Sequence, residues 1–461
     1  MKTRIVLLAL FVTGILPAGF SRAVETKPKE NLPELVNTAL ANNPELKSSQ
    51  ARWEMFRNRI AQARSFDDPM LMLKIQNGIV TDPLNYHRDP MTQKVIGISQ
   101  QIPFWGKRGL KEEIAAKDAE SYRWQVEERK LELVRMVKET YYQIYFTDKS
   151  LEIVAKNIRI LDDFITIAET KYAVGQGAQQ DVFKSQVESS KMLDMKISLE
   201  QERKSLVVAL NALLYRPPET TVGMVPEFEI TPVPVSAGNL RETAFEKRPV
   251  FKDLKAQIEK GEAGHRLAKK EFYPDFNVSF EYMQREPTMG SDGSDMYSLG
   301  VTFNLPLQRE RRHAMVADSD SEVRMATEEL NGIRNTIDSN ISDLLAKLEK
   351  REKLVNLYKS GIIPQAEQSL ESATIGYRVN KVDFLTLLDS RVTLFNYERD
   401  LYESLADYMV RMAQLEAAVG VDLESASSMQ ITSSPQTILE NAQPLTPSVP
   451  ASPAPELSQH H

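Results

Sequence analysis

Residues 109–172 read GLKEEIAAKDAESYRWQVEERKLELVRMVKETYYQIYFTDKSLEIVAKNIRILDDFITIAETKY, with no proline and no glycine after Gly109. A continuous helix over this stretch would be roughly 95 Å long, whereas ordinary globular helices have about 11–12 residues. In its second half, apolar residues recur with the spacing of a coiled-coil seam: Leu151, Val154, Ile158, Leu161, Ile165, Ala168 and Tyr172. A rod of this length cannot bury its own seam, so the sequence predicts partner helices of matching length.

The composition limits the class of protein. The chain has 461 residues, of which 42% are hydrophobic and 26% charged, with a formal net charge of −7. This acidic balance argues against a nucleic-acid partner, and no basic patch alternates with aromatic residues. We find no nucleophile motif, no glycine-rich phosphate loop and no acid paired with a base, so we expect neither enzymatic activity nor a cofactor. Because the chain has no cysteine, its stability must come from packing or assembly rather than disulfides.

The two ends of the chain differ from its middle. Residues 1–23 are predicted to be a signal peptide, because Lys2 and Arg4 precede a short apolar run and small residues follow at the cleavage site. The run is shorter than the ~20 residues of a membrane span, which favours export over an anchor. No later apolar stretch is long enough for a helix to span a bilayer. Residues 422–461 are rich in Ser, Pro and Gln and are predicted to be disordered.

The pattern of apolar residues changes along the first half of the chain. Prolines at positions 33 and 44 mark helix starts, and a period of two then replaces the helical period. Gly175 and Gly177 are helix-stop residues that should end the long rod. The predicted order is therefore short helices over about 32–42 and 44–66, a hairpin over 70–102, rods over 109–174 and 179–214, and a proline-rich linker over 216–238.

The second half of the chain repeats the first. The same residue types recur at an offset of 205 positions: Pro44 and Pro249, Pro69 and Pro274, Tyr172 and Tyr377, and Leu210 and Leu415. Within the hairpins the offset is 203, so the loop that connects the two strands is two residues shorter in the second hairpin than in the first. A constant offset indicates two tandem repeats, over residues 32–215 and 239–421. The second repeat should contain a hairpin over 275–305 and rods over 311–379 and 383–419.

The predicted strands have one apolar and one polar face. Phe276, Val278, Phe280 and Tyr282 alternate with small or polar residues, and the next strand does the same. An apolar face of this kind meets a second sheet in a soluble protein, or lipid in an outer-membrane barrel. Each strand has about 9–11 residues, the length of a tilted membrane strand. Four strands cannot close a barrel, since known barrels start at about eight, so either the sheet is a soluble cap or several chains share one barrel.

At this point the sequence resembles the TolC-like outer-membrane efflux family. The resemblance covers about residues 32–421 and rests on the duplicated order of elements and on two tips, Tyr172-Ala-Val-Gly175 and Tyr377-Arg-Val-Asn380. It implies a mainly α fold with a membrane β-barrel portion, closed as a trimer to which each chain gives four strands. A long periplasmic tunnel of coiled-coil helices would lie below the barrel.

The resemblance also implies a function. The chain would be the outer-membrane exit duct of a tripartite efflux system, with a periplasmic adaptor, an inner-membrane pump of the RND type and outer-membrane lipid as partners. Segments 100–108 and 361–367 resemble the heavy-metal efflux branch, a weaker signal than the one for the family, and make heavy-metal cations one candidate substrate. The alternatives are the duct of a type I protein secretion system and a periplasmic coiled-coil structural protein.

The resemblance assigns roles to residues near the tips. The adaptor would dock at Tyr172, Val174, Gly175, Val379 and Asn380. The family narrows its tunnel with acidic residues nine and twelve positions after the second-tip tyrosine, which here are Thr386 and Asp389, with Asp383 as the next candidate. The family closes the mouth with a link between that tyrosine, here Tyr377, and Asp181. In the family a basic residue five positions after the tyrosine takes part in this link. This chain has Val382 at that position, so Lys381 or Arg378 would take over the role.

Three further features bear on metals and on the second rod. His87, His265 and His313 share no metal-ligand spacing, so the sequence predicts no metal site from histidine. Met70, Met72 and Met91 flank the first hairpin, and their thioethers suit Cu(I), but membrane-facing or barrel-packing methionine is the more common explanation and the one we favour. Pro364 lies inside the second rod and should kink it or loosen one turn.

Overall fold

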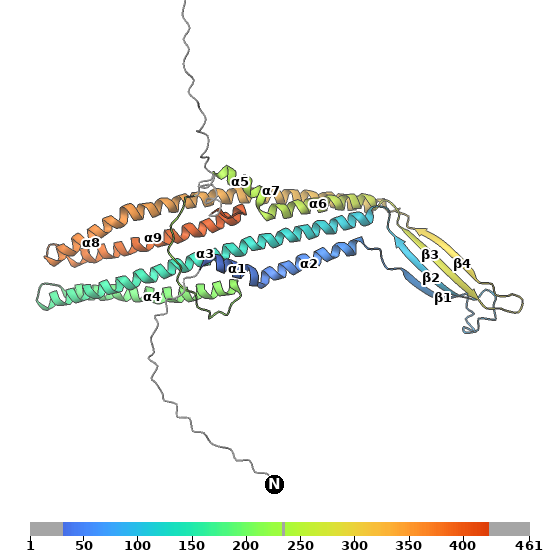
Figure 1. Cartoon of the computed structure of the whole chain (residues 1–461), viewed down its shortest axis with the longest axis horizontal. Helices are drawn as coiled ribbons and strands as arrows, with labels where there is room; N and C mark the ends of the chain where they lie inside the picture. The colour runs from blue at the N-terminus through green and yellow to red at the C-terminus, as the bar shows by residue number, and fades with distance from the viewer. Residues whose placement is uncertain (1–30, 233–235, 424–461) are drawn as a thin grey trace, which may run out of the picture.

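The computed structural model describes residues 31–232 and 236–423, so the predicted signal peptide and nearly all of the predicted tail lie outside the described residues. The chain forms a long helical body with a small sheet at one end (Figure 1). The elements are α1 (Leu32–Asn42), α2 (Pro44–Arg64), β1 (Met70–Gln76), β2 (Gln93–Ile102), α3 (Lys107–Ala173), α4 (Gln179–Leu214), α5 (Ala237–Lys247), α6 (Pro249–Lys270), β3 (Phe276–Arg285), β4 (Met296–Phe303), α7 (Arg309–Leu357), a π-helical turn (Tyr358–Ile362), α8 (Ile363–Arg378) and α9 (Phe384–Val419).

Helix α3 is the spine of the body and packs against α2, α4, α6 and α9. Helices α2 and α4, with 21 and 36 residues, lie end to end beside the 67 residues of α3 (Figure 1). Asn43 fixes this junction, because its side-chain amide donates to the Leu213 carbonyl at 3.1 Å and its Oδ1 caps α2. At the corresponding place 205 residues later, Arg248 Nη1 donates to the Ala418 carbonyl at 3.4 Å. The two helix junctions are therefore built at equivalent positions of the sequence.

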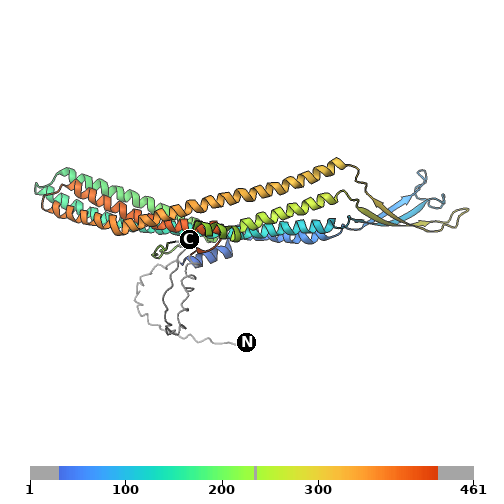
Figure 2. The ribbon, with the colours of Figure 1, turned by 90° about the horizontal axis from the view of Figure 1, so that it is seen from above.

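The apolar core has two parts along the body. One lies at the helix junctions and includes Val137, Ile144, Leu210 and Leu415. The other lies toward the tips and includes Val154, Leu161 and Phe395, which belong to α3 and α9. Figure 2 shows α8 and α9 lying beside α3 and α4 at the tip end. The coiled-coil seam seen in the sequence is thus buried by helices from both halves of the chain.

The second rod, predicted over 311–379, runs from Arg309 to Arg378 and contains one turn of a different helical type. One π-helical turn, Tyr358–Ile362, separates α7 from α8 and ends two residues before Pro364. Proline lacks an N–H group, and its ring clashes with the carbonyl group four residues earlier, so the turn before it widens. The loosened turn expected from Pro364 is therefore present.

The four strands form one antiparallel sheet in the order β1-β2-β3-β4. The two faces of the sheet differ in burial. On β2, Gln93, Val95 and Gly97 of one face are buried, while Ile96 and Ile98 of the other face are exposed. We call the more buried face, most of whose residues are small or polar, the concave face, and the apolar face with Ile96 and Ile98 the convex face. Within the described residues, each of β1 and β4 has a strand neighbour on one side only.

The edge strands β1 and β4 are shorter than the predicted 9–11 residues, with 7 and 8 residues respectively. The central strands β2 and β3 have 10 each, as expected. The central strands continue past the last paired residues of the edge strands, β2 to Ile102 and β3 to Arg285. Pro69, which has no N–H group to donate, directly precedes β1.

A buried lysine joins the sheet to the helical body. Lys107 begins α3 with a side chain only 2% exposed, and its Nζ lies 3.2 Å from Glu271 and 3.0 Å from Asp275. Asp275 also accepts a hydrogen bond from the Phe104 N–H at 2.8 Å, and the Phe104 ring stacks on Tyr273 at 4.6 Å. Breaking a buried ion pair typically costs about 3–5 kcal/mol, so these contacts hold the two strand-to-helix corners together.

None of the helices in the described part of the chain is long and apolar enough to cross a membrane.

The convex face gives a first prediction. Val301 lies on that face opposite Val278, and Thr302 beside it lies on the concave face. If the convex face meets lipid near the membrane midplane, Val301→Arg should destabilise the protein by about 2–4 kcal/mol. The yield of folded oligomer in native outer membranes, measured by gel shift without heating, should fall sharply. Thr302→Arg is the matched control and should keep the yield; equal yields for the two variants would contradict the prediction.

Candidate functional site

The two helix tips lie at the end of the body away from the sheet (Figure 1). Each tip turns through one residue with positive φ: Gly175 at +72° in the first and Asn380 at +60° in the second. Glycine adopts this conformation without strain, and asparagine tolerates it better than most residues. The side chains of Val174 and Val379 next to them are exposed. Both tips therefore present an exposed valine on a tight turn.

The two tip tyrosines have different environments. Tyr172 is 48% exposed, whereas Tyr377 is 6% exposed and packs against Phe384 with ring centroids 5.5 Å apart. Burial raises the pKa of Tyr377, and the nearby carboxylate of Asp181 adds to the shift. However, the Tyr377 hydroxyl group is buried and has no hydrogen-bond partner in the described part of the chain. The expected link between Tyr377 and Asp181 is therefore not formed as a hydrogen bond within one chain.

A lysine from the first tip joins the two tips instead. Lys171 Nζ donates to the Tyr377 carbonyl at 2.6 Å and to Asn380 Oδ1 at 2.5 Å, and it lies 4.1 Å from the centre of the Tyr377 ring. Arg378 and Lys381, which the sequence suggested for this role, are exposed and make no side-chain hydrogen bond or ion pair with the residues described. Arg378 directly follows the buried Tyr377 at the end of α8 and so points away from the face on which Tyr377 is buried, and Lys381 lies in the turn that follows.

The tip turns also explain the valine at position 382. A Cβ atom added to Gly376 would lie 2.5 Å from Val382 Cγ2, so Val382 folds back onto a residue that must be glycine. In the first tip the glycine and the larger residue have changed places: Gly177 lies against Lys171. A Cβ atom added to Gly177 would be 3.0 Å from the Cβ atom of Lys171. Each turn thus pairs one glycine with one larger residue. Because Gly177 leaves room for Lys171, the lysine side chain can reach across to the second tip.

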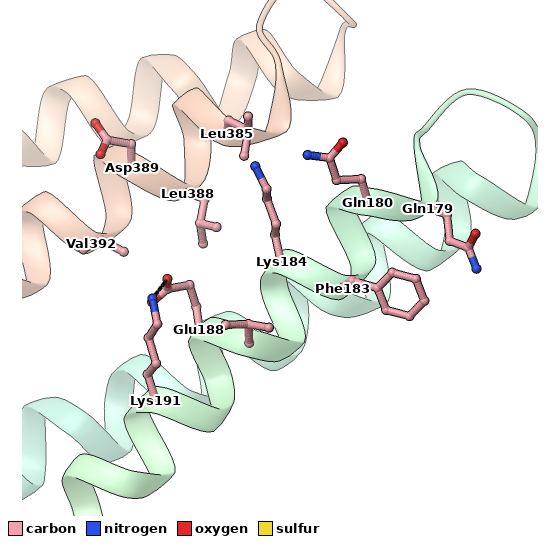
Figure 3. A pocket seen from close by; sticks show the side chains of 11 residues that line it. Gln179, Gln180, Phe183, Lys184, Glu188, Lys191, Leu385, Leu388, Asp389 and Val392 are labelled. Atoms are coloured by element: carbon pink, nitrogen blue, oxygen red, sulfur yellow. Dashed lines mark hydrogen bonds and ion pairs between the residues drawn. The ribbon is translucent and has the colours of Figure 1, made fainter.

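The acidic candidates are at the start of α9. Asp383 is the N-cap of this helix, because its Oδ1 accepts a hydrogen bond from the Thr386 N–H at 2.7 Å. Hydrogen bonding from the Thr386 side chain, together with that from its N–H, lowers the pKa of Asp383. This carboxylate is therefore already used to cap a helix. Asp389 lies six residues further along α9 and is exposed. Figure 3 shows its carboxylate pointing away from α4.

A groove of about 850 Å³ lies between α4 and α9 beside the tips. Its floor is apolar and its rim is charged (Figure 3). The lining side chains are Gln179, Gln180, Phe183, Lys184, Val187, Glu188, Lys191, Leu385, Leu388, Asp389 and Val392. The sequence analysis did not single out Phe183, Val187 or Leu385, although apolar residues four positions apart on an exposed helix face could have indicated them.

The described residues contain no group of three or more His, Cys, Asp or Glu side chains that could hold a metal ion. His265 contacts Ser319 and Asp320 through one ring nitrogen, which is not the geometry of a catalytic triad. The tip site therefore offers turns, an apolar groove and charges, which are features of a docking or gating surface.

The lysine contact gives a second prediction. Lys171→Met keeps most of the side chain but removes the ammonium group, so the second tip loses its two hydrogen bonds to Lys171. A hydrogen bond to a charged group contributes about 1.5–3 kcal/mol, so amide exchange over residues 376–384 should become roughly tenfold faster or more. Hydrogen–deuterium exchange with mass spectrometry measures this. Lys381→Met is the control and should leave the exchange unchanged; a similar effect of both variants would show that Lys171 has no special role.

Comparison with known proteins identifies the family. The sequence model of the outer membrane efflux protein family matches residues 35–214 and again 240–421. The cobalt-zinc-cadmium resistance protein CzcC of Cupriavidus metallidurans is 21% identical over 364 residues, 78% of this chain and 82% of that protein. The outer membrane protein TolC of Vibrio cholerae is 21% identical over 434 residues, 90% and 95% of the two chains. The crystal structure of the outer membrane protein VceC of Vibrio cholerae superposes with a TM-score of 0.72 at 18% identity, covering 85% of this chain and 96% of that one. The chain is a member of the outer membrane efflux protein family, whose proteins are outer-membrane channels of tripartite pumps.

Proposed function

We propose that three copies of this chain close into one outer-membrane barrel and serve as the exit duct of a tripartite efflux system. The observation that carries the proposal is the four-stranded sheet with an apolar convex face and two strands, β1 and β4, that each have one strand neighbour within the described residues. In lipid, every backbone N–H and C=O group must be satisfied, so such edges have to pair. Strand β4 of one copy runs antiparallel to β1 of the next and can continue the sheet.

The helical body supports a place for the chain in the periplasm. The tips lie far from the sheet, where an adaptor from the inner membrane can reach them (Figure 1). The groove between α4 and α9 has the apolar floor and charged rim that suit an amphipathic helix of the adaptor. We assign docking to Tyr172, Val174, Gly175, Val379 and Asn380 together with this groove. An RND-type pump would then deliver the substrate through the adaptor.

Heavy-metal cations are the proposed substrate. The support is the similarity to a protein named for cobalt, zinc and cadmium resistance, together with the corner segment 100–108 and segment 361–367. No observation favours the type I secretion duct, and membership of an outer-membrane efflux family argues against a periplasmic structural protein. The two separate ranges matched by the family model support the tandem repeats.

The docking proposal gives a third prediction. Gly175 has open space around its Cα and a φ of +72°, and Gly290 in the second hairpin has open space and a φ of +111°. Gly175→Trp should abolish efflux, measured as metal tolerance of a strain that depends on this duct, because the indole ring blocks the tip. Gly290→Trp imposes similar backbone strain at the opposite end of the molecule and should keep tolerance. Both variants should form oligomers; full tolerance with Gly175→Trp in assembled oligomers would exclude docking at this turn.

The acidic residue of α9 gives a fourth prediction. In a trimer, Asp389 would form a ring of three carboxylates, which attracts cations and hinders anions. Asp389→Ala should therefore lower the cation-over-anion permeability ratio in planar bilayers and weaken block by multivalent cations added from the tip side. Asp389→Glu keeps the charge and should behave like the unchanged protein. Unaltered selectivity in Asp389→Ala would place the constriction elsewhere, with Asp383 and Thr386 the next residues to test.

A further inference from the structure

Exposed aromatic side chains gather where the helical body meets the sheet. Phe66, Trp105 and Tyr273 are 51%, 74% and 50% exposed. They belong to three different connections: Phe66 lies between α2 and β1, Trp105 between β2 and α3, and Tyr273 between α6 and β3 (Figure 1). Folding usually covers most of a large aromatic ring, so three exposed rings at one end of the body mark an interaction surface.

This aromatic surface continues the convex face of the sheet. The Trp105 ring contacts Phe276 and Phe104, in each case with ring centroids 5.5 Å apart. Phe276 is the first residue of β3 and lies directly opposite Ile102 on the convex face. The apolar face therefore runs without a break from the sheet to Trp105. If lipid covers the convex face, Trp105 lies where the hydrocarbon ends and the headgroups begin, a level at which tryptophan and tyrosine are enriched.

Two cations lie over rings of the same corner. The guanidinium carbon of Arg108 is 3.7 Å from the centre of the Phe66 ring, and Lys270 Nζ is 5.8 Å from the centre of the Phe104 ring. Both flank the turn at Gly106, since a Cβ atom added there would lie 3.4 Å from Lys270 Nζ and Arg108 follows two residues later. Neither cation makes an ion pair within residues 31–232 and 236–423. The rings hold the two cations in place without neutralising their charge.

The carboxylates of this corner do not neutralise the two cations either. Glu271 and Asp275 both pair with the buried Lys107, at 3.2 and 3.0 Å. Asp67 and Asp68, which follow Phe66 in the sequence, form no ion pair with any residue that the structure describes. The charge of the exposed cations is therefore available to a partner outside the chain.

Helix stability does not explain the position of Arg108. It lies in the first turn of α3, which contains no acidic residue. The helix dipole favours acidic residues in a first turn, so a cation there is locally unfavourable. Lys270 lies in the last turn of α6, where a cation suits the dipole. Arg108 is therefore the residue that most clearly requires an anion from outside the chain.

We propose that this corner binds the headgroup of an anionic glycerophospholipid, with Arg108 and Lys270 on the phosphate group and Trp105 beside the start of the acyl chains. The inference rests on the proposed placement of the sheet in the outer membrane and adds a lipid of defined charge to it. A guanidinium group presents a planar set of donors that fits phosphate oxygens. Because the corner is on the side of the helical body, the lipid belongs to the leaflet that faces the periplasm.

The test uses the full-length oligomer, purified and reconstituted into phosphatidylcholine vesicles with an increasing fraction of phosphatidylglycerol that carries brominated acyl chains. Bromine quenches the fluorescence of Trp105 when the lipid lies beside it, and a Trp105→Phe variant gives the signal of the other tryptophans. The same titration with brominated phosphatidylcholine provides the reference, so the ratio of the two midpoints measures the preference for the anionic headgroup. We expect a preference of at least about fivefold, as for two cations that face an anionic lipid.

Variants test whether the two cations cause this preference. Replacing Arg108 and Lys270 by glutamine should lower the ratio to about one. The matched control replaces Lys255 and Arg334 by glutamine; these cations also lie over a ring, 4.5 and 4.7 Å from the centre of Phe245, but in the helical body. The control should keep the preference. Arg108→Lys combined with Lys270→Arg retains both charges and should keep most of it.

The outcomes separate the headgroup site from the proposed function. Equal quenching of Trp105 by the two lipids, or an unchanged preference in the glutamine variant, would show that the headgroup site is wrong while the sheet stays in the membrane. If neither lipid quenches Trp105, the corner does not contact lipid, and the proposed membrane placement fails. A stronger preference for vesicles that contain lipid A, lost in the glutamine variant, would place the cations in the opposite leaflet and overturn the inference. Oligomer formation and K⁺ conductance should be the same in all variants.

Discussion

The fold of this chain depends on the need to bury the apolar seam of one 67-residue helix, α3. An isolated helix of any length leaves its apolar stripe in water, and its stability comes mostly from packing. Here the stripe is covered by α2 and α4 on one side and by α6 and α9 on the other. Because the partner helices are shorter, they have to be joined end to end, and Asn43 and Arg248 are placed at those two junctions.

The sheet, like α3, has an apolar surface that must be covered. Its convex face is apolar, and β1 and β4 each have one strand neighbour in the part of the chain that the structure describes, so neither that face nor those edges are covered there. The buried ammonium group of Lys107 fixes the corner between sheet and body by pairing with Glu271 and Asp275, which lie between α6 and β3. Because this corner is rigid, the position of the sheet follows from the position of the helices. Assembly of the helical bodies of several copies would therefore also bring their sheets together.

The two tips show how similar sequences acquire different roles. Tyr172 and Tyr377 stand at equivalent positions, but one is exposed and the other is buried. The close contact within each turn needs one glycine, which is Gly177 in the first tip and Gly376 in the second. This exchange leaves a lysine, Lys171, in the position that faces the second tip, and Lys171 rather than Arg378 or Lys381 makes the link.

The sequence by itself determined the local elements, because their signals are periodic and local. Residues near one another were enough to predict the seam of α3, the alternation of the strands, the widened turn before Pro364 and the family resemblance. The mainly α fold with a four-stranded antiparallel sheet is confirmed. The tandem repeats, the trimer and the role of Asp389 stay predictions. Only the tertiary structure decided which residue joins the tips and where the groove between α4 and α9 lies. These features depend on which segments pack together across about 200 residues of chain, and side-chain partners over such distances leave no period in the sequence.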